Sequence, residues 1–389
     1  MHILSLDMYQ TLALAVGVLY LGMFLKKRIR FLEKFCIPSP VIGGLIFALL
    51  SLGLFVFDET LKTVCMVIFF TSVGFQANLR ILKSGGVSLV IFLVCVIVLI
   101  LGQNFLSVGL AKFMGLDSLI GLCTGSIPMV GGHGTSGAFG PVLEDLGVSG
   151  ATTLCTAAAT FGLVAGSLIG GPLGRRLIIK HDLMKTVVTE DEAPLVEEEH
   201  KKHRSVSMYA PAAYQIAIAM GIGTVVSWLL SKTGMTFPIY IGAMIVAAVM
   251  RNISEFHGAF HIHIGEINDI GGICLSMFLG IAMITLKLWQ LAELALPLVV
   301  LLLGQLVFMF LFSYFVVYNI MGRNYDAAVL SAGTCGFGMG ATPNAMANMQ
   351  ALTEKFAPSV KAYIIVPIIG SMFADFINSL CVTFFINMM

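Results

Sequence analysis

Charged residues are scarce in this chain: Asp, Glu, Lys and Arg make up 11% of its 389 residues, whereas hydrophobic residues make up 58%. A soluble domain carries about 25% charged residues, and the mean hydropathy here is +0.96. Apolar stretches of about 20 residues, the length of helix that crosses the hydrocarbon core, recur along the chain. The composition therefore excludes an ordinary water-soluble protein and predicts an all-α membrane protein with several spans.

Motifs for enzymatic chemistry are also missing. The sequence has no GxxxxGK[ST], HExxH or GxSxG pattern, and no nucleophile/base pair or metal triad inside the apolar stretches, so we expect neither an enzyme nor an ATP-driven pump. A net charge of +1 without a basic run argues against nucleic acid. A histidine and glutamate cluster indicates a solvated loop face rather than a transition-metal site. It comprises His257, His261, His263, Glu255 and Glu266.

The cysteines and one series of glycines are best explained by helix packing. The eight cysteines are scattered, with no CxxC pair and no zinc-ligand spacing, as expected of buried packing residues. Four glycines spaced by four predict a packing or sliding seam between helices. They are Gly162, Gly166, Gly170 and Gly174.

Ten apolar stretches are predicted to span the membrane. Residues 1–10 contain no Lys or Arg, so the first stretch does not resemble a cleaved signal. The ten are Met8–Leu25, Pro40–Phe57, Leu61–Leu79, Val87–Gly109, Gly150–Gly171, Tyr209–Leu230, Phe237–Met250, Ile270–Leu286, Leu294–Tyr318 and Val360–Ile386. Two more stretches, Ser118–Leu143 and Ala327–Leu352, are interrupted by Gly and Pro, and each predicts a re-entrant hairpin.

A hydrophilic segment divides the chain. His181–Arg204 contains two acidic triplets followed by a lysine pair, which is typical of a solvated linker. We therefore predict an N-terminal repeat over 1–180, a cytoplasmic linker over 181–205 and a C-terminal repeat over 206–389. The hairpins fall at about 118–143 and 327–352.

The distribution of Lys and Arg tests this assignment, because these residues accumulate in cytoplasmic loops. If the N-terminus is outside, 18 of the 22 fall in inside loops. The outside loops keep only Lys62, Lys112, Lys232 and Lys287. The bias predicts that both termini face the periplasm across a bacterial inner membrane.

The two halves also share landmarks. Three glycine pairs are each 208 positions apart: Gly125 with Gly333, Gly132 with Gly340, and Gly162 with Gly370. Because each half has five spans, an odd number, the second half enters from the opposite side. The sequence thus predicts two inverted-topology five-helix repeats, whose paired broken segments indicate a transporter's binding site.

The hairpins carry the candidate substrate-binding residues. Irregular backbone at membrane depth needs protein or a wet cavity to satisfy its polar groups. Short hydroxyl and amide residues after each break suit the start of a half-helix, which attracts carboxylates. The alternative role for these glycines is close helix packing. The candidates are Gly132, His133, Gly134, Thr135, Ser136, Gly340, Ala341, Thr342, Pro343 and Asn344.

One acid, Asp375, lies in the middle of a predicted span, with Asn378 on the same helical face. Intramembrane acids are costly and usually functional. With Asn348 these form the candidate sodium site, although Asp375 could instead hold a substrate ammonium group or be a neutral carboxyl bonded to another helix. His133 could bind substrate or a proton, or make a structural hydrogen bond. No Lys or Arg lies deep in a span, so backbone amides, hydroxyls and Asn side chains would hold an anionic substrate.

At these hairpins the sequence resembles the bacterial glutamate:sodium symporter family, over nearly the whole chain and most densely in Gly131–Thr135, Ala159–Val164 and Asn324–Asn348. The resemblance implies two five-span domains of opposite orientation, Na⁺-coupled uptake of L-glutamate, and a homodimer with elevator-like movement in the lipid bilayer. Sodium would be the coupling ion, with no cofactor. The alternatives are a sodium-coupled carrier of another small carboxylate and an ion channel, which would place its broken helices around a continuous pore.

Overall fold

The computed structural model describes residues 4–30, 32, 38–51, 55–79, 86–186, 206–232, 237–258, 260–286 and 295–389. Strands β1 (Leu4–Leu6) and β2 (Phe55–Phe57) pair in parallel. The other described elements are helices, in agreement with the expected all-α membrane protein, and the predicted span over 40–57 is a shorter helix, α3 (Ser39–Ser51), followed by β2. The aromatic and β-branched sequence Phe-Val-Phe favours the extended backbone here.

The remaining elements of the first half are helices. They are α1 (Met8–Arg28), α4 (Thr60–Gln76), α6 (Gly86–Phe113), α7 (Ser118–Leu122), α8 (Ser126–Met129), α9 (Gly132–Asp145), α10 (Ala151–Lys180) and the short η1 (Leu183–Thr186). Residues 187–205 of the predicted linker lie outside the described residues.

The described secondary-structure elements of the second half are all helices. It comprises α11 (Val206–Ser231), α12 (Ile241–His257), α13 (Ile264–Ile284), α14 (Ala295–Leu311), the π-helix η3 (Phe312–Val317), α15 (Tyr318–Ile320), α16 (Tyr325–Gly338), α17 (Thr342–Thr353), α18 (Val360–Pro367), the π-helix η4 (Ile368–Phe373) and α19 (Ala374–Met388).

Each of the ten predicted spans overlaps one of these helices. In the part of the chain that the structure describes, six helices are long and apolar enough to cross a membrane. A seventh is formed if Val360–Gly370 and Ala374–Met388, which are bent by 43°, are counted as one span. The other predicted spans coincide with the shorter α3, α4 and α12, so the total of ten stays a prediction.

The helices begin at recognisable sequence signals. Asp7 accepts hydrogen bonds from the N–H groups of Tyr9 and Gln10, and the Gln10 side chain bonds back to the Asp7 N–H, which forms a capping box at α1. Asp117 caps α7, and Asn324 caps α16 by accepting the Ala327 N–H at 2.9 Å. These short side chains fix where the hairpin segments start.

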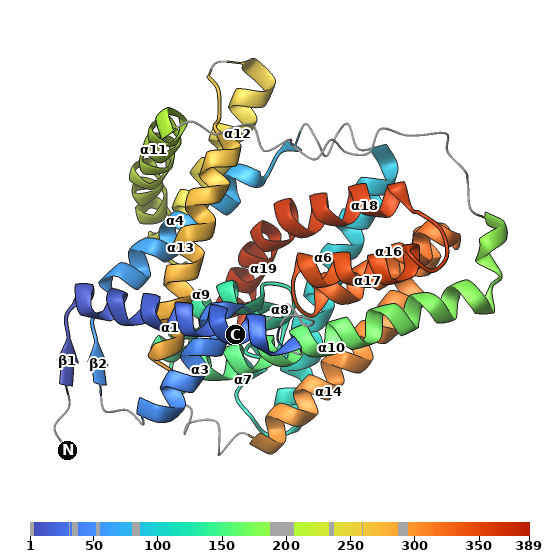
Figure 1. The fold of residues 1–389 in the computed structure, drawn as a ribbon, viewed down its shortest axis with the longest axis horizontal. Coiled ribbons are helices and arrows are strands. Elements are labelled where there is room, and N and C mark those ends of the chain that lie inside the picture. The colour runs from blue at the N-terminus through green and yellow to red at the C-terminus, as the bar shows by residue number, and fades with distance from the viewer. Residues whose placement is uncertain are drawn as a thin grey trace.

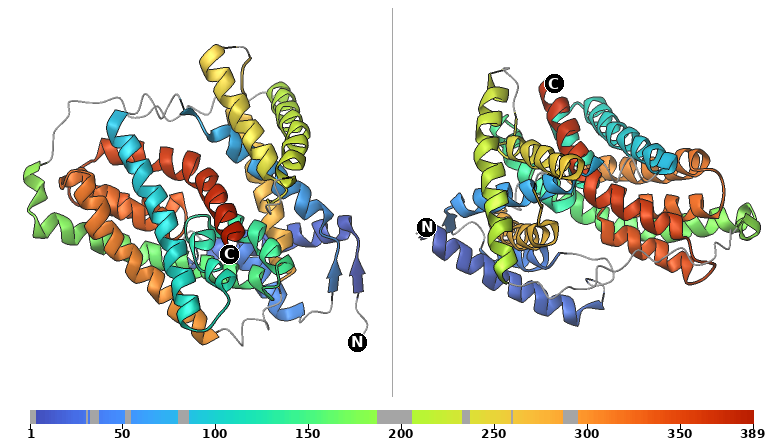
Figure 2. Two further views of the ribbon diagram at one scale, coloured as in Figure 1. Left: turned by 180° about the vertical axis from the view of Figure 1, so that it is seen from behind. Right: turned by 90° about the horizontal axis from the view of Figure 1, so that it is seen from above.

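The helices pack as two bodies, each built from both halves of the chain. The six-helix body contains α1, α3 and α4 together with α11, α12 and α13. The hairpin body contains α6 to α10 together with α14 to α19. Figure 1 shows the two bodies on either side of the molecule, and the view from above in Figure 2 shows the same division.

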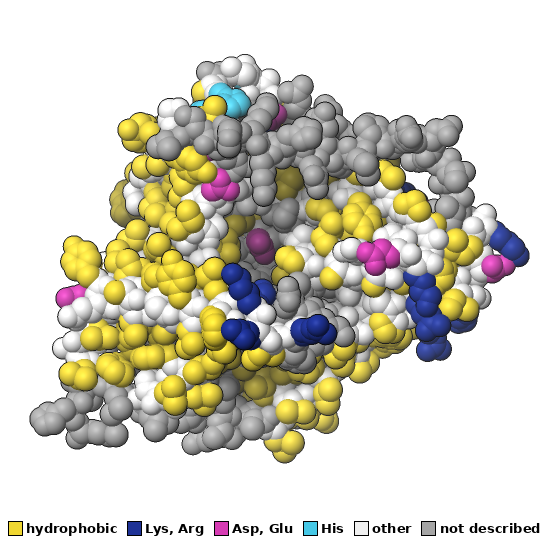
Figure 3. Space-filling model, viewed as in Figure 1, with side chains coloured by type: hydrophobic (Ala, Val, Ile, Leu, Met, Phe, Trp, Pro, Cys, Tyr) yellow, Lys and Arg dark blue, Asp and Glu magenta, His cyan; other side chains and the backbone are white. Residues whose placement is uncertain are grey.

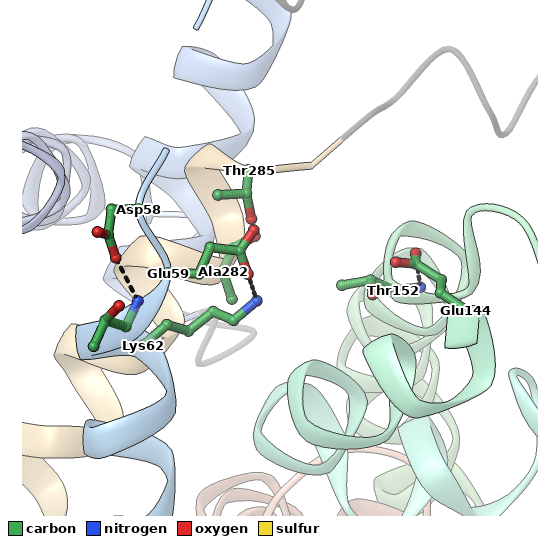
Figure 4. Close-up of polar contacts among 8 residues, drawn as sticks. Asp58, Glu59, Lys62, Glu144, Thr152, Ala282 and Thr285 are labelled. Carbon is green, nitrogen blue, oxygen red and sulfur yellow. Dashed lines mark hydrogen bonds and ion pairs between the residues drawn. The ribbon is translucent and has the colours of Figure 1, made fainter. Parts of the chain in front are cut away.

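The seam between the bodies is largely apolar. Tyr240 stacks on Phe70 of the six-helix body with ring centroids 3.9 Å apart, and meets the edge of Phe139 of α9 at 6.1 Å. Nearby polar contacts stay within one body (Figure 4): Lys62 pairs with Glu59 on one side, and Glu144 accepts the Thr152 N–H at 3.0 Å on the other. These polar contacts therefore do not link the two bodies.

Candidate functional site

The second hairpin is a sharp turn between two helical arms. Helix α16 ends at Gly338 and α17 begins at Thr342, with Ala341 extended between them at φ −163° and ψ 160°. Pro343 sits in the first turn of α17, where its missing N–H costs nothing. The tip, residues 339–341, therefore ends one helix and precedes the next.

The first hairpin has a different shape. Its entering arm is split into α7 and α8, and its leaving arm, α9, begins at Gly132. Gly132 has φ +58°, a left-handed conformation that glycine adopts without the steric cost a Cβ would add. The new helix thus starts three residues before Thr135. Thr135 and Ser136 lie inside α9, and the Ser136 hydroxyl donates to the carbonyls of Gly132 (2.7 Å) and Cys155 (3.2 Å).

The two tips approach each other. A Cβ on Gly132 would lie 3.1 Å from the carbonyl oxygen of Gly340. Beside this contact is a cavity of about 310 Å³, which is within the size range of small-molecule sites. Its polar and tip residues are Gly131, Gly132, His133, Gly134, Gly340, Ala341, Thr342, Pro343, Gln76 and Asp375. Among the described residues that line it, Asp375 is the one carboxylate, and none is Lys or Arg.

Amide side chains hold both hairpins in position. Asn344 and Asn348 of α17 donate to carbonyls of α10, Leu163 at 2.9 Å and Gly166 at 3.0 Å. Hairpin one is held from outside: Asn378 of α19 donates to the Ser126 carbonyl at 3.0 Å, and Asn104 of α6 accepts the Ser126 N–H at 2.8 Å. Since these amides are buried, the bonds satisfy backbone that the breaks leave without helical partners.

The structure brings together most of the predicted site residues and separates the rest. Gly132, His133, Gly134 and the segment 340–343 line the cavity with Asp375, at the start of α19 directly after the π-helix η4. Thr135, Ser136, Asn344, Asn348 and Asn378 are buried behind it. The imidazole of His133 lies 3.0 Å from the hydroxyl of Thr160 on α10, so its hydrogen bond is to a neighbouring helix rather than within the turn.

Several buried oxygens are available to a cation. Within the described part of the chain, Ser126 Oγ, Asn344 Oδ1 and Asn378 Oδ1 have no hydrogen-bond partner. Hard cations such as Na⁺ take carbonyl, hydroxyl and carboxylate oxygens. Asn378, predicted to bind sodium, and Asn344, predicted to bind the substrate, each have such an oxygen.

Sequence reasoning missed the buried amides of the long helices. Gln103 of α6 donates to the Gly338 carbonyl at 2.7 Å, and Gln305 of α14 donates to the Gln103 carbonyl at 2.8 Å. Both side chains are fully buried. Their signal was an uncharged amide inside an otherwise apolar run, which is costly to bury without a partner. They support the tip of hairpin two from behind.

Comparison of the sequence with known proteins identifies its family. The family model for sodium/glutamate symporters matches residues 4–358. A sodium/glutamate symporter of Escherichia coli (strain K12) is 41% identical over 392 residues, covering 98% of both chains. One from Haemophilus influenzae is 40% identical over 387 residues, covering 95% of both. The resemblance noted in the hairpin motifs is thereby confirmed, and the chain belongs to the sodium/glutamate symporter family.

Proposed function

We propose that this multi-pass membrane protein is a secondary transporter that couples the entry of sodium to the uptake of L-glutamate. The observation that carries this is the cavity between the two hairpin tips. Gly132, Thr342 and Asp375 all line it. In this proposal the backbone N–H and hydroxyl groups of the tips bind the carboxylates, and Asp375 binds a cation or the ammonium group. Family membership supports both cargoes.

The direct test is uptake of labelled L-glutamate into proteoliposomes. With an inward sodium gradient we expect accumulation, and with potassium or choline in place of sodium we expect only background. Uptake that saturates but ignores sodium would overturn the coupling. Flux that neither saturates nor requires sodium would favour the channel alternative.

Competition identifies the cargo. Excess unlabelled aspartate, citrate or 2-oxoglutarate is added to the same assay. If L-glutamate is the substrate, it should compete at lower concentration than each of these. Stronger competition by one of the others would support the alternative, a sodium-coupled carrier of another small carboxylate.

For the topology we propose two inverted five-span repeats with hairpins entering from opposite sides. The matching order of elements supports this: each half gives three helices to the six-helix body, then a long helix, a broken segment and a final helix to the hairpin body. Both termini are proposed to face the periplasm of an inner membrane. Labelling of single cysteines added at each end in intact cells with an impermeant maleimide should succeed at both.

For the mechanism we propose that the hairpin body moves as a unit against the six-helix body, in an elevator-like manner within a homodimer. The apolar seam and the confinement of the amide clamps to the hairpin body support this. A cysteine at Ala341, in a background without native cysteines, should be labelled from opposite sides of the membrane in different sodium and glutamate conditions. Labelling from one side in every condition would contradict the movement, and a monomer by native mass spectrometry would contradict the dimer.

Coupling stoichiometry follows from charge. Glutamate carries −1, and moving one charge against an inside-negative potential costs about 2.3 kcal/mol per 100 mV. One Na⁺ cancels that charge, so potential-driven accumulation needs at least two cations. We expect a valinomycin-imposed inside-negative potential to accelerate uptake, and indifference to the potential would contradict this stoichiometry.

A further inference from the structure

A second, larger cavity lies away from the hairpin tips, between the end of α10 and the end of α17. Its volume is about 650 Å³. Its charged lining residues are Arg175, Arg176, Lys180 and Lys355. Figure 3 shows Lys and Arg side chains gathered at the end of the molecule where α10 and η1 lie. The cavity therefore carries four positive charges and, among the described residues that line it, no carboxylate.

The acids near this cluster that the structure describes bond to other residues. Glu354 accepts a hydrogen bond from Gln350 at 2.6 Å, and Asp182 pairs with Lys185. Within the part of the chain that the structure describes, no ion pair involves Arg175, Arg176 or Lys355. Lys180 is held by Tyr314, whose hydroxyl accepts from its Nζ at 2.9 Å.

Residues of α10 and of the end of α17 line the cavity. At Gly171, a Cβ would meet no neighbouring side chain or other segment within 4 Å. Ile179, Leu352 and Phe356 add an apolar wall. The cavity thus combines guanidinium groups, which bind phosphate oxygens in a bidentate way, with a surface suited to a hydrocarbon chain.

The position of the cavity agrees with this chemistry. Helix α10 has 30 residues and is about 45 Å long, which matches a bilayer including both headgroup layers. The basic end of α10 therefore reaches the headgroup level, on the side that the positive charges predict to be cytoplasmic. Anionic lipids are concentrated there, and basic pockets between helices hold their headgroups.

We propose that this cavity binds the phosphate group of an anionic phospholipid, with Arg175, Arg176 and Lys355 contacting the phosphate and Ile179 and Phe356 contacting an acyl chain. The lipid binds on the hairpin body, because α10 and α17 both belong to it. Free phosphate could bind the same cations, but it has no hydrocarbon chain to contact the apolar side of the cavity. The site requires neither sodium nor glutamate.

The test is native mass spectrometry of the full-length, delipidated protein titrated with phosphatidylglycerol or phosphatidylcholine. The variant R175Q/R176Q/K355Q removes three cations from the cavity and leaves the Lys180–Tyr314 contact in place. Its matched control, K26Q/K27Q/R28Q, removes three cations from the end of α1 on the same predicted side. The charge-preserving R175K/R176K keeps the attraction and loses the guanidinium geometry. Melting temperatures in detergent verify that all three variants fold.

We expect the unmodified protein to bind phosphatidylglycerol about tenfold tighter than phosphatidylcholine. The cavity variant should lose about tenfold of that affinity, the control less than twofold, and the Lys variant should fall between them. Equal losses in cavity variant and control, or no preference for the anionic lipid, would overturn the site. Displacement of phosphatidylglycerol by millimolar inorganic phosphate would overturn the lipid assignment in favour of free phosphate. None of these outcomes depends on transport, so they stand apart from the uptake test.

Discussion

The two hairpins meet at one cavity but differ in where their amide anchors lie. In hairpin two, Asn344 and Asn348 reach from α17 to carbonyls of α10, and Gln103 of α6 adds one bond to the Gly338 carbonyl. In hairpin one, the amides come from neighbouring helices, because Asn378 and Asn104 both bond to the backbone of Ser126. The amide anchors of hairpin two therefore lie mainly within the hairpin itself, whereas those of hairpin one belong to α6 and α19.

The hairpins also differ in their neighbours. Helices α9, α16 and α17 all pack extensively on α10 of their own body, but α9 of hairpin one also contacts α13 of the six-helix body. A Cβ on Gly134 would be 3.4 Å from Phe69 of the six-helix body. Hairpin one is thus the side of the cavity that touches the seam. If the hairpin body moves, hairpin one would slide along the six-helix body, whereas hairpin two would move together with α10.

The largest effect is expected at the one carboxylate that both tips face. Asp375→Asn keeps the size of the side chain but removes the charge available to sodium or the substrate ammonium group. Because interactions with charged groups contribute about 1.5–3 kcal/mol, sodium-driven uptake should fall by about 10- to 100-fold. Asp145→Asn, on the exposed end of α9, is the control. Equal uptake in the two variants would remove Asp375 from the site.

The second-largest effect is expected for a substitution at Gly132, whose left-handed backbone conformation has no counterpart in hairpin two. Gly132→Ala forces a Cβ into φ +58°, next to the Gly340 carbonyl. The strain is about 1–2 kcal/mol, so uptake at limiting glutamate should fall by about 5- to 30-fold. Gly147→Ala provides the control, because Gly147 has φ +100° but no atom within 4 Å of its Cβ position. Similar losses in both variants would mean that strain alone, rather than contact between the tips, matters.

Each amide hydrogen bond is expected to stabilise its hairpin by about 1 kcal/mol. Asn344→Ala should weaken hairpin two alone, and Asn378→Ala should weaken hairpin one. Hydrogen exchange of the purified protein should then rise in α16 and α17 for the first variant, and in α8 and α9 for the second. If either variant loosens both hairpins equally, the supports are shared and the comparison fails.

The smallest effect is expected for a hydroxyl outside the cavity. Ser136 is buried and bonded to Gly132 and Cys155, so Ser136→Ala should change the KM for glutamate by less than about threefold. Thr342 lines the cavity, and Thr342→Val should raise the KM by about 3- to 10-fold, as expected for loss of one hydrogen bond. The reverse order would restore Ser136 as a substrate ligand.

The sequence predicted those features of the fold that depend on neighbouring residues, namely the helices and the turn of hairpin two. Gly and Pro restrict the backbone directly, so Gly338, Gly340 and Pro343 were enough to locate the turn of hairpin two. Hydropathy located a helix at each of the ten predicted spans. The repeat landmarks pointed to the same two broken segments.

The remainder depends on packing between distant segments. The start of α9 at Gly132 follows from a left-handed φ that the motif permits but does not require. The amide bonds of Gln103, Asn344 and Asn378 join residues far apart in the chain, and no local pattern specifies their partners. The pairing of β1 with β2 brings together residues about 50 positions apart, beyond the reach of periodicity.

The glycine stripe of α10 has a mechanical consequence. A Cβ on Gly162 or Gly166 would come within 2.3 or 2.7 Å of a carbonyl oxygen of Met339 or Cys335, and one on Gly170 would meet Asn348 at 2.1 Å. Backbones in such contact leave no slack for local rearrangement. In the proposed mechanism, cargo that binds at the tip of hairpin two would therefore move this hairpin and α10 together. The basic cavity at the other end of α10 would move with them.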